Sequence, residues 1–201
     1  LLLAAGKGTR LLPYTKYWPK CLMPINEFPL LDYWLTPLVK ITDKIFINKH
    51  YHHKIIENYL KIPSYRNVNQ IHEERLLGTA GTIRKLVKEQ RYIEKLLVIH
   101  ADNLSIFELE SFINFHSEKR FKNNAYMSMM TFNTNSPRDS GIAYSENHKL
   151  VKFLEKPLVS SHNVANGAIY IIEREIINFI LSNNSINDFS TQVIPLFLGK
   201  I

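Results

Sequence analysis

Two glycines, an arginine and a lysine stand close together at the head of the chain. In "LLLAAGKGTRLLPYTKYWPK", Gly6 and Gly8 follow a short apolar run, and Arg10 and Lys20 come after them. An apolar strand followed by GxG lets the backbone approach a ligand, because glycine has no side chain to block it. Phosphate is the usual ligand of such amide-rich turns. Arg10 and Lys20 add the positive charge that a polyphosphate attracts.

The familiar phosphate loops do not fit this segment. The dinucleotide fingerprint GxGxxG fails because Leu11 stands where the third glycine should pack a helix on a strand, which disfavours an NAD-dependent dehydrogenase. The pattern GxxxxGK[ST] does not occur, nor do the HRD and DFG partners of a kinase loop. Prolines prevent a regular helix across the segment, so we expect a stiffened loop. They are Pro13, Pro19, Pro24 and Pro29.

The elements that must position this loop alternate between strand and helix patterns. We expect strands at 44–48, 67–74 and 96–100 and helices at 54–60, 79–89 and 107–120. We then expect strands at 125–132, 141–145, 150–155 and 166–172 and helices at 173–181 and 189–197. Strand–helix alternation implies crossover connections and a mainly parallel sheet. The pattern predicts an α/β sandwich with a mixed sheet.

Length and composition predict one globular domain with a small anionic ligand. The 201 residues are 45% hydrophobic, enough for one well-packed core. The 25 Lys and Arg against 18 Asp and Glu give a net charge of +7. Because no run of five or more like charges occurs, phosphorylated small molecules fit better than nucleic acid. We expect no nucleic-acid partner.

The single cysteine and the apolar start bear on location. Cys21 cannot form an internal disulfide, which favours a cytoplasmic protein, and we expect it to be a buried small apolar residue. Residues 1–5 are too short an apolar run for a signal peptide or a membrane span. We expect no membrane partner.

Three histidines lie close together in "NKHYHHKII". His50, His52 and His53 contain no pair at the i, i+4 spacing that places two metal ligands on one helix face. We therefore expect surface or loop histidines.

The opening segment resembles the signature of the sugar-1-phosphate nucleotidylyltransferases, GxGTR followed by PK, with every signature residue in place. Four later segments are similar to motifs of that family in the same order: "LLGTAGTI", "HADN", "FLEKP" and "NGAIYII". The resemblance covers nearly the whole chain. It implies a Rossmann-like three-layer sandwich with a mainly parallel mixed sheet, formed by residues 1–201 as a single nucleotidyltransferase domain. It also allows a homo-oligomer.

The resemblance implies a site for a nucleoside triphosphate and a sugar 1-phosphate. The catalytic residues would be Arg10, Lys20 and Asp102, with Asp102 as the Mg²⁺ ligand. The nucleotide would be bound by Leu3, Ala4, Ala5, Gly6, Lys7, Gly8, Thr9, Arg10, Glu74, Gly78, Thr79 and Gly81. The sugar phosphate would be bound by Gly141, Glu155, Lys156, Asn166 and Gly167. A structural ion pair is an alternative role for Glu155.

The chemistry that the resemblance implies needs cations more than a base. A phosphate oxygen of the sugar 1-phosphate attacks the α-phosphorus in line, and pyrophosphate leaves. That phosphate is largely dianionic near neutral pH, with a second pKa of about 6, so the enzyme must mainly offset repulsion between anions. Asp102 follows an apolar strand, and open α/β sheets bind ligands at the carboxyl ends of their strands.

Base and sugar are open at this point. The segments "LLGTAG" and "DFSTQVIPLFLGKI" are most similar to enzymes that make GDP-mannose or a GDP-heptose from GTP, as in cell-surface polysaccharide biosynthesis. The alternative within enzymes is a thymidylyl- or uridylyltransferase acting on glucose 1-phosphate. The alternative of another class is a catalytically silent module that binds a sugar nucleotide as a regulator.

The ends of the chain suggest a clipped sequence. It begins without Met and stops at Ile201, before the segment in which relatives usually carry a second metal-binding aspartate. Asp188 is the only acid after Glu175, and its place before residues 189–197 favours a helix N-cap. We therefore expect a domain truncated at its C-terminus, with half of a metal site and poor turnover.

Overall fold

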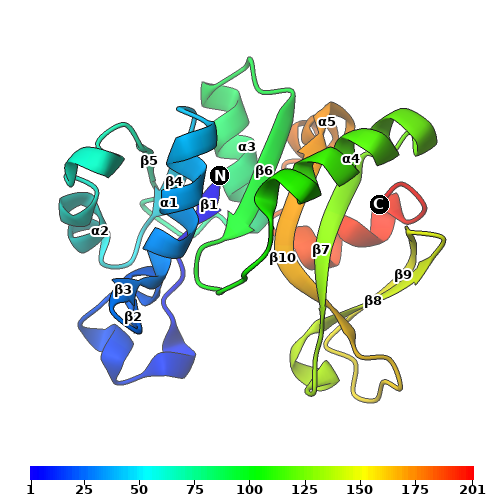
Figure 1. Cartoon of the computed structure of the whole chain (residues 1–201), viewed down its shortest axis with the longest axis horizontal. Coiled ribbons are helices and arrows are strands. Elements are labelled where there is room, and N and C mark those ends of the chain that lie inside the picture. The colour runs from blue at the N-terminus through cyan, green and yellow to red at the C-terminus, as the bar shows by residue number, and fades with distance from the viewer. The chain divides into compact units, whose positions relative to one another are not determined.

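The computed structural model describes residues 1–201, which form two compact units (Figure 1). The first unit comprises Leu1–Leu77 and Ile99–Leu104, and the second comprises Gly78–Val98 and Ser105–Ile201. Strand β6 (Lys95–His100) crosses the boundary, because its last two residues belong to the first unit.

The sheet of the first unit is parallel throughout. Its strands β1 (Leu2–Leu3), β4 (Phe46–Lys49), β5 (Asn69–His72) and the end of β6 follow the order β5-β4-β1-β6. Leu2 pairs with Ile47 on one side and with Ile99 on the other. Parallel strands buried on both faces read as short apolar runs, and β1 and β4 are buried at every position.

Besides three 3₁₀ turns between Thr9 and Leu22, the first unit contains three further helical segments and a hairpin. They are the hairpin of β2 (Pro24–Ile25) and β3 (Phe28–Pro29), helices α1 (Leu30–Ile41) and α2 (His53–Tyr59), and the 3₁₀ turn η4 (Pro63–Tyr65). The sequence patterns did not single out α1. It contains Pro37, which lacks the N–H of a regular helical hydrogen bond. Burial of Leu31, Trp34 and Leu35 along one stripe stabilises the helix nevertheless.

The second unit has an antiparallel sheet beside β6. Its strands are β7 (Met127–Asn133), β8 (Gly141–Glu146), β9 (Lys149–Glu155) and β10 (Val164–Glu173). Strand β10 lies between β6 and β8, β9 follows β8, and β7 also pairs with β10. The 3₁₀ turn η5 (Pro137–Asp139) precedes β8.

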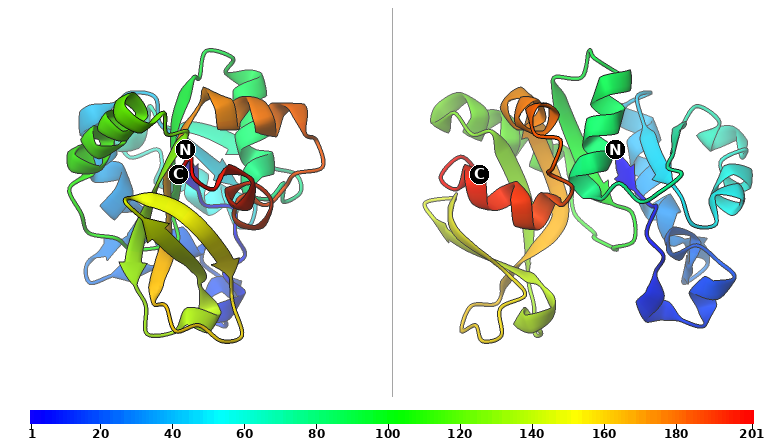
Figure 2. Two further views of the ribbon diagram at one scale, coloured as in Figure 1. Left: turned by 90° about the vertical axis from the view of Figure 1, so that its right-hand side faces the viewer. Right: turned by 180° about the vertical axis from the view of Figure 1, so that it is seen from behind.

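Helices cover both faces of the strands of the second unit (Figure 2). Helix α4 (Leu109–Asn123) lies on one face, and α3 (Thr79–Glu89) and α5 (Arg174–Ser182) lie on the other. The chain ends in α6 (Phe189–Gln192) and the 3₁₀ turn η6 (Ile194–Phe197). The expected fold is confirmed: a mixed sheet of mainly parallel strands flanked by helices.

The expectation of one helix over 189–197 is wrong. The α-helix ends at Gln192, and the chain continues as a 3₁₀ turn. Pro195 explains the break, because it cannot donate the helical hydrogen bond to the carbonyl of Thr191 and its ring crowds that carbonyl.

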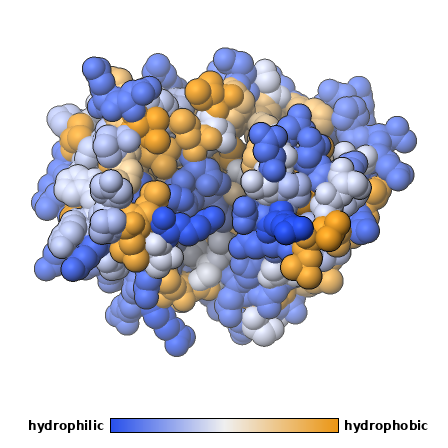
Figure 3. All heavy atoms as spheres, turned by 90° about the horizontal axis from the view of Figure 1, so that it is seen from below, coloured by the Kyte–Doolittle hydropathy of each residue, from blue (hydrophilic) through white to orange (hydrophobic).

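Exposed apolar residues occur in several separate groups on the face shown in Figure 3.

Cys21 is buried as expected, with 1% of its surface exposed. Burial is the main cause that raises the pKa of its thiol to about 12, and the Asp102 carboxylate raises it further. None of the helices is both long and apolar enough to cross a lipid bilayer.

A buried histidine joins three elements of the second unit. His116 on α4 has Nδ1 2.9 Å from the Ser128 hydroxyl of β7 and Nε2 2.9 Å from a Glu173 carboxylate oxygen of β10. Because a carboxylate only accepts, Nε2 carries the proton and the neutral Nδ1 accepts from Ser128. Burial lowers the pKa of His116 and outweighs the raising effect of Glu173.

This network predicts a pH dependence of stability. Since the pKa of His116 is lower folded than unfolded, the unfolded chain binds the proton more readily, and the free energy of unfolding falls as the pH drops below about 6.5. We expect His116→Gln to be less stable than wild type at pH 7.5 and to lose less stability on going to pH 5.5. Urea unfolding at both pH values measures this, with the exposed His148→Asn as control. Equal pH dependence in wild type and His116→Gln would contradict the prediction.

Candidate functional site

The glycine-rich loop leaves the end of β1 and passes through three short turns before the β2–β3 hairpin. They are η1 (Thr9–Leu11), η2 (Tyr14–Lys16) and η3 (Lys20–Leu22), all of 3₁₀ type. No α-helix forms between Gly6 and Pro29, as the prolines predict. Arg10 is exposed on η1, and Lys20 opens η3.

The two glycines of the loop have different roles. Gly8 has φ +63, and a Cβ there would lie 2.9 Å from Cγ2 of Thr15 and 3.1 Å from Cβ of Lys20. The hydroxyl of the buried Thr15 donates to the Gly8 carbonyl at 2.9 Å. Gly6 has open space around its Cα. Gly8 is therefore needed for the turn itself, whereas Gly6 leaves its backbone accessible.

Lys20 and Asp102 meet although 82 positions separate them. Nζ of Lys20 lies 2.7 Å from Oδ2 of Asp102. Asp102 lies two residues beyond β6, at the carboxyl end of that strand, where it was expected. Both side chains remain partly exposed, at 22% and 37%. The pair is therefore accessible to a ligand that competes for either partner.

A cavity of about 410 Å³ opens beside this pair. It is lined by Gly8, Thr9, Arg10, Leu11, Lys20, Asp102 and Asn103. Backbone of the loop, two cations and one carboxylate thus border one space within the first unit. Such a set can bind a polyphosphate, and an adjoining cation through the carboxylate.

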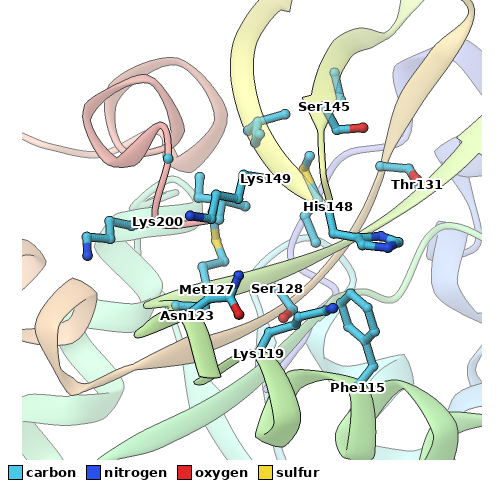
Figure 4. Close-up of a pocket in the computed structure, with 16 residues that line it drawn as sticks. Phe115, Lys119, Asn123, Met127, Ser128, Thr131, Ser145, His148, Lys149 and Lys200 are labelled. Atoms are coloured by element: carbon cyan, nitrogen blue, oxygen red, sulfur yellow. The ribbon is translucent and has the colours of Figure 1, made fainter. Parts of the chain in front are cut away.

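A smaller cavity of about 170 Å³ lies in the second unit, among α4, β7, β8 and the end of the chain (Figure 4). Lys119, Lys149 and Lys200 line it, together with His148. None of the residues that the sequence singled out for the site borders it. We therefore place the candidate site at the loop.

Glu73 is buried next to the loop, and the sequence analysis missed it. Its carboxylate accepts from Nδ2 of Asn48 at 2.8 Å and from the Leu77 backbone N–H at 3.1 Å. Oδ1 of Asn48 in turn accepts from the Ala4 N–H at 2.6 Å. The neighbouring Glu74, which was singled out instead, is exposed. Strand alternation after the buried Ile71 would have pointed to Glu73.

The residues Gly78, Thr79 and Gly81 lie where α3 begins. Gly78 has φ +76, and a Cβ there would lie 2.4 Å from the Asn187 carbonyl oxygen. The Thr79 hydroxyl accepts from the Phe189 N–H at 2.7 Å. Gly81 is buried within the helix. Gly78 and Thr79 thus join the start of α3 to the segment around the start of α6.

The predicted sugar-phosphate residues lie on neighbouring strands of the second unit. Gly141 of β8 pairs with Glu155 of β9, and a Cβ on Gly141 would meet Glu155 Oε2 at 2.8 Å. Lys156 follows in a left-handed conformation, with its N–H 3.1 Å from the Ser140 carbonyl. Desolvation raises the pKa of the Glu155 carboxyl above its usual value. The positive charge of Lys156 offsets part of this rise.

Asn166 and Gly167 lie on β10 beside these residues in the sheet. Nδ2 of Asn166 donates to the Tyr170 hydroxyl at 2.6 Å, and its Oδ1 accepts from the Ala168 N–H at 2.9 Å. A Cβ on Gly167 would lie 3.0 Å from the Met130 carbonyl oxygen. The side chain of Asn166 is therefore held in one orientation.

The acids of the chain offer a limited metal site. No group of three or more His, Cys, Asp or Glu side chains is close enough to hold an ion. Asp188 caps α6, since its Oδ1 accepts from the Thr191 N–H at 2.8 Å, which confirms the N-cap expectation. Asp102 fits Mg²⁺ as one carboxylate beside a phosphate cavity, because this ion commonly takes one or two carboxylates plus substrate phosphates.

Comparison with known proteins identifies the family. The family described as Nucleotidyl transferase matches residues 1–200. The chain belongs to this family. It is similar to the mannose-1-phosphate guanylyltransferase of Mycobacterium tuberculosis (26% identity over 203 residues, 99% of this chain and 55% of that protein). It is also similar to the UTP–glucose-1-phosphate uridylyltransferase of Synechocystis (28% identity over 202 residues, 90% and 50%).

Solved nucleotidyltransferases share the fold. The structure of HddC from Yersinia pseudotuberculosis has a TM-score of 0.76 and 23% identity, and covers 98% of this chain and 84% of its own. A UDP-glucose pyrophosphorylase complexed with UDP-glucose has a TM-score of 0.73 and 22% identity, and covers 94% and 82%. The chain spans about half the length of the curated relatives it matches.

The contrast between the glycines gives a stability prediction. Gly8→Ala places a Cβ in a left-handed turn against Thr15, so we expect the free energy of unfolding to fall by about 1–3 kcal/mol. Gly6→Ala adds a methyl group to open space and should change it by less than about 0.5 kcal/mol. Urea denaturation of both variants measures the difference. Equal stability of the two would show that Thr15 does not constrain the turn.

Proposed function

We propose that this chain is the catalytic part of a sugar-1-phosphate nucleotidylyltransferase, with both units in one nucleotidyltransferase domain. The reaction joins a nucleoside triphosphate and a sugar 1-phosphate into an NDP-sugar and releases pyrophosphate. The observation that carries the proposal is the Lys20–Asp102 contact beside the cavity of the glycine-rich loop. The match of the family to residues 1–200 supports it.

In this proposal the loop binds the triphosphate. Amides around Gly6 to Thr9 and the guanidinium of Arg10 bind phosphate oxygens, the latter as a planar fork. Lys20 acts as a point charge on the phosphate that reacts. It offsets repulsion as the sugar-phosphate oxygen forms a bond to the α-phosphorus and the bond to pyrophosphate breaks. No side chain has to remove a proton from the nucleophile, since the phosphate is already ionised.

Asp102 is the residue that would hold Mg²⁺ in this proposal, and the ion would supply charge neutralisation on the phosphates when bound. Asp102 also pairs with Lys20, which keeps that ammonium at the border of the cavity. The Glu155, Lys156 and Asn166 side chains would bind the sugar phosphate. The orientation of Asn166 by Tyr170 and Ala168 supports such a recognition role.

We propose GTP with mannose 1-phosphate or a heptose 1-phosphate as the substrate pair. The similarity to a mannose-1-phosphate guanylyltransferase over 99% of this chain supports the choice. The similarity to a glucose-1-phosphate uridylyltransferase keeps a thymidylyl or uridylyl reaction on glucose 1-phosphate as the second candidate.

A substrate panel tests the proposal. Each nucleoside triphosphate is mixed with mannose, heptose and glucose 1-phosphates and Mg²⁺, and released pyrophosphate is measured. We expect release with GTP and mannose or heptose 1-phosphate above all other pairs. Release with UTP or dTTP and glucose 1-phosphate would favour the second candidate. Binding of nucleotide sugars without any release would favour a silent regulatory module.

Lys20 offers the sharpest test of mechanism. Lys20→Ala removes charge at the reacting phosphate, so we expect kcat to fall about 10²- to 10³-fold with little change in stability. Lys16→Ala is the matched control, because Lys16 is an exposed cation of the same loop outside the cavity. We expect its kcat to stay near that of wild type. Wild-type turnover by Lys20→Ala would remove the assigned role.

A further inference from the structure

The histidine-rich turn after β4, which holds His50, His52 and His53, contacts two segments of the first unit: the glycine-rich loop, which lines the cavity, and the Glu73 segment, which does not line it. Nδ1 of His50 lies 2.8 Å from the Glu73 carbonyl oxygen. Nε2 of His52 lies 3.2 Å from the Thr15 carbonyl oxygen. Because a carbonyl only accepts, His50 donates from Nδ1 and His52 donates from Nε2. Each ring thus fixes the backbone of a different segment.

The contact of His52 reaches the phosphate loop through one further bond. Thr15 is 1% exposed, and its hydroxyl donates to the carbonyl of Gly8. Its Cγ2 lies against the space that a Cβ on Gly8 would fill. Gly8 then accepts from the Leu11 N–H at 2.9 Å, which closes η1. His52 therefore supports the turn that carries Arg10 without touching the cavity itself.

The backbone of His52 supports a specific role for this residue. It has φ 53 and ψ 30, in the left-handed region that residues other than glycine adopt uncommonly, although Asn, Asp and His are over-represented there. Such a conformation persists where the surroundings fix it. His52 stands immediately before α2, and the Tyr51 ring packs on its imidazole with centroids 4.0 Å apart. The imidazole is thereby aimed at Thr15.

The contact of His50 acts on the second segment. His50 holds the backbone carbonyl of Glu73. The side-chain carboxylate of the same residue accepts from the Asn48 amide and the Leu77 N–H. Asn48 accepts from the Ala4 N–H at the start of the loop. The glycine-rich loop and the Glu73 segment are thus linked to each other through Asn48, and both are linked to the histidine-rich turn.

We infer that His50 and His52 are positioning residues for nucleotide binding: they hold the Gly8–Lys20 loop and the Glu73 segment in the arrangement that receives the triphosphate. The inference rests on the proposed function for its ligand and on the hydrogen bonds for its geometry. His52 carries the larger effect, since its partner leads directly to Gly8.

The test compares a variant that keeps a hydrogen-bond donor at position 52 with a variant that has an apolar side chain there. His52→Gln keeps an N–H near the position of Nε2, whereas His52→Leu keeps volume without a donor. We expect His52→Leu to raise the Kd for the nucleoside triphosphate about three- to tenfold, the worth of one net hydrogen bond, and His52→Gln to restore most of it. His53→Leu is the matched control, since His53 contacts Glu57 and His72 but not the loop.

A second measurement is independent of any ligand. Amide hydrogen exchange of Leu11, whose N–H bonds to Gly8, should be faster in His52→Leu than in wild type and His53→Leu. Thr15→Val keeps the shape but removes the hydroxyl, and should speed the same exchange even if His52→Leu fails to fold.

The outcomes separate the two proposals. Unchanged Leu11 exchange in both His52→Leu and Thr15→Val overturns the positioning role, whatever the substrate. A Kd in His52→Gln as weak as in His52→Leu overturns it as well, because donation would then not matter. If wild type neither binds any nucleoside triphosphate nor releases pyrophosphate, the proposed function fails. Faster Leu11 exchange in both variants would then still support the loop-holding role.

Discussion

The parallel pairing of β1 between β4 and β6 is the constraint on which the candidate site depends. Strand β1 has two residues, and its neighbours bond to it on both sides, as in the Ile99 N–H to Leu1 carbonyl bond of 2.9 Å. Parallel strands bring their carboxyl ends to one edge of a sheet. The glycine-rich loop follows β1, the histidine-rich turn follows β4, and Asp102 follows β6. Glu73 follows β5, which pairs in parallel with β4. Their proximity therefore follows from strand order and direction.

Two carboxylates near this edge differ in their exposure and in their hydrogen-bond partners. Asp102 is partly exposed and pairs with one lysine, so solvent screens it and a ligand can replace its partner. Glu73 is 1% exposed and accepts hydrogen bonds from the Asn48 amide and the Leu77 N–H. A buried charge with hydrogen-bond partners is costly to rearrange. Asp102 is thus suited to exchange partners, whereas Glu73 is suited to hold backbone in place.

The second unit presents its residues in a different setting. Gly141, Glu155 and Asn166 lie on antiparallel strands, whose register sets side chains of adjacent strands opposite one another. Intrachain packing already restricts Gly141 and Gly167, because a Cβ at either would meet protein atoms within 3.0 Å. The solved structures that share this fold at 20 to 23% identity include a UDP-glucose pyrophosphorylase and HddC.

The sequence by itself determined the local features. Apolar runs predicted β4, β6 and the strands of the second unit, the prolines predicted a loop without an α-helix, and Asp188 was correctly placed as an N-cap. Each of these depends on residues a few positions apart. The break at Pro195 was missed although its cause is local, the absent N–H and the ring of proline. Helix α1 was missed because the burial of Leu31, Trp34 and Leu35, which outweighs the cost of Pro37, depends on tertiary packing. Only the tertiary structure decided that Glu73 rather than Glu74 is buried, that Lys20 meets Asp102, and that His52 holds Thr15. These contacts join residues 25 to 82 positions apart through the order of parallel strands, which no local pattern encodes.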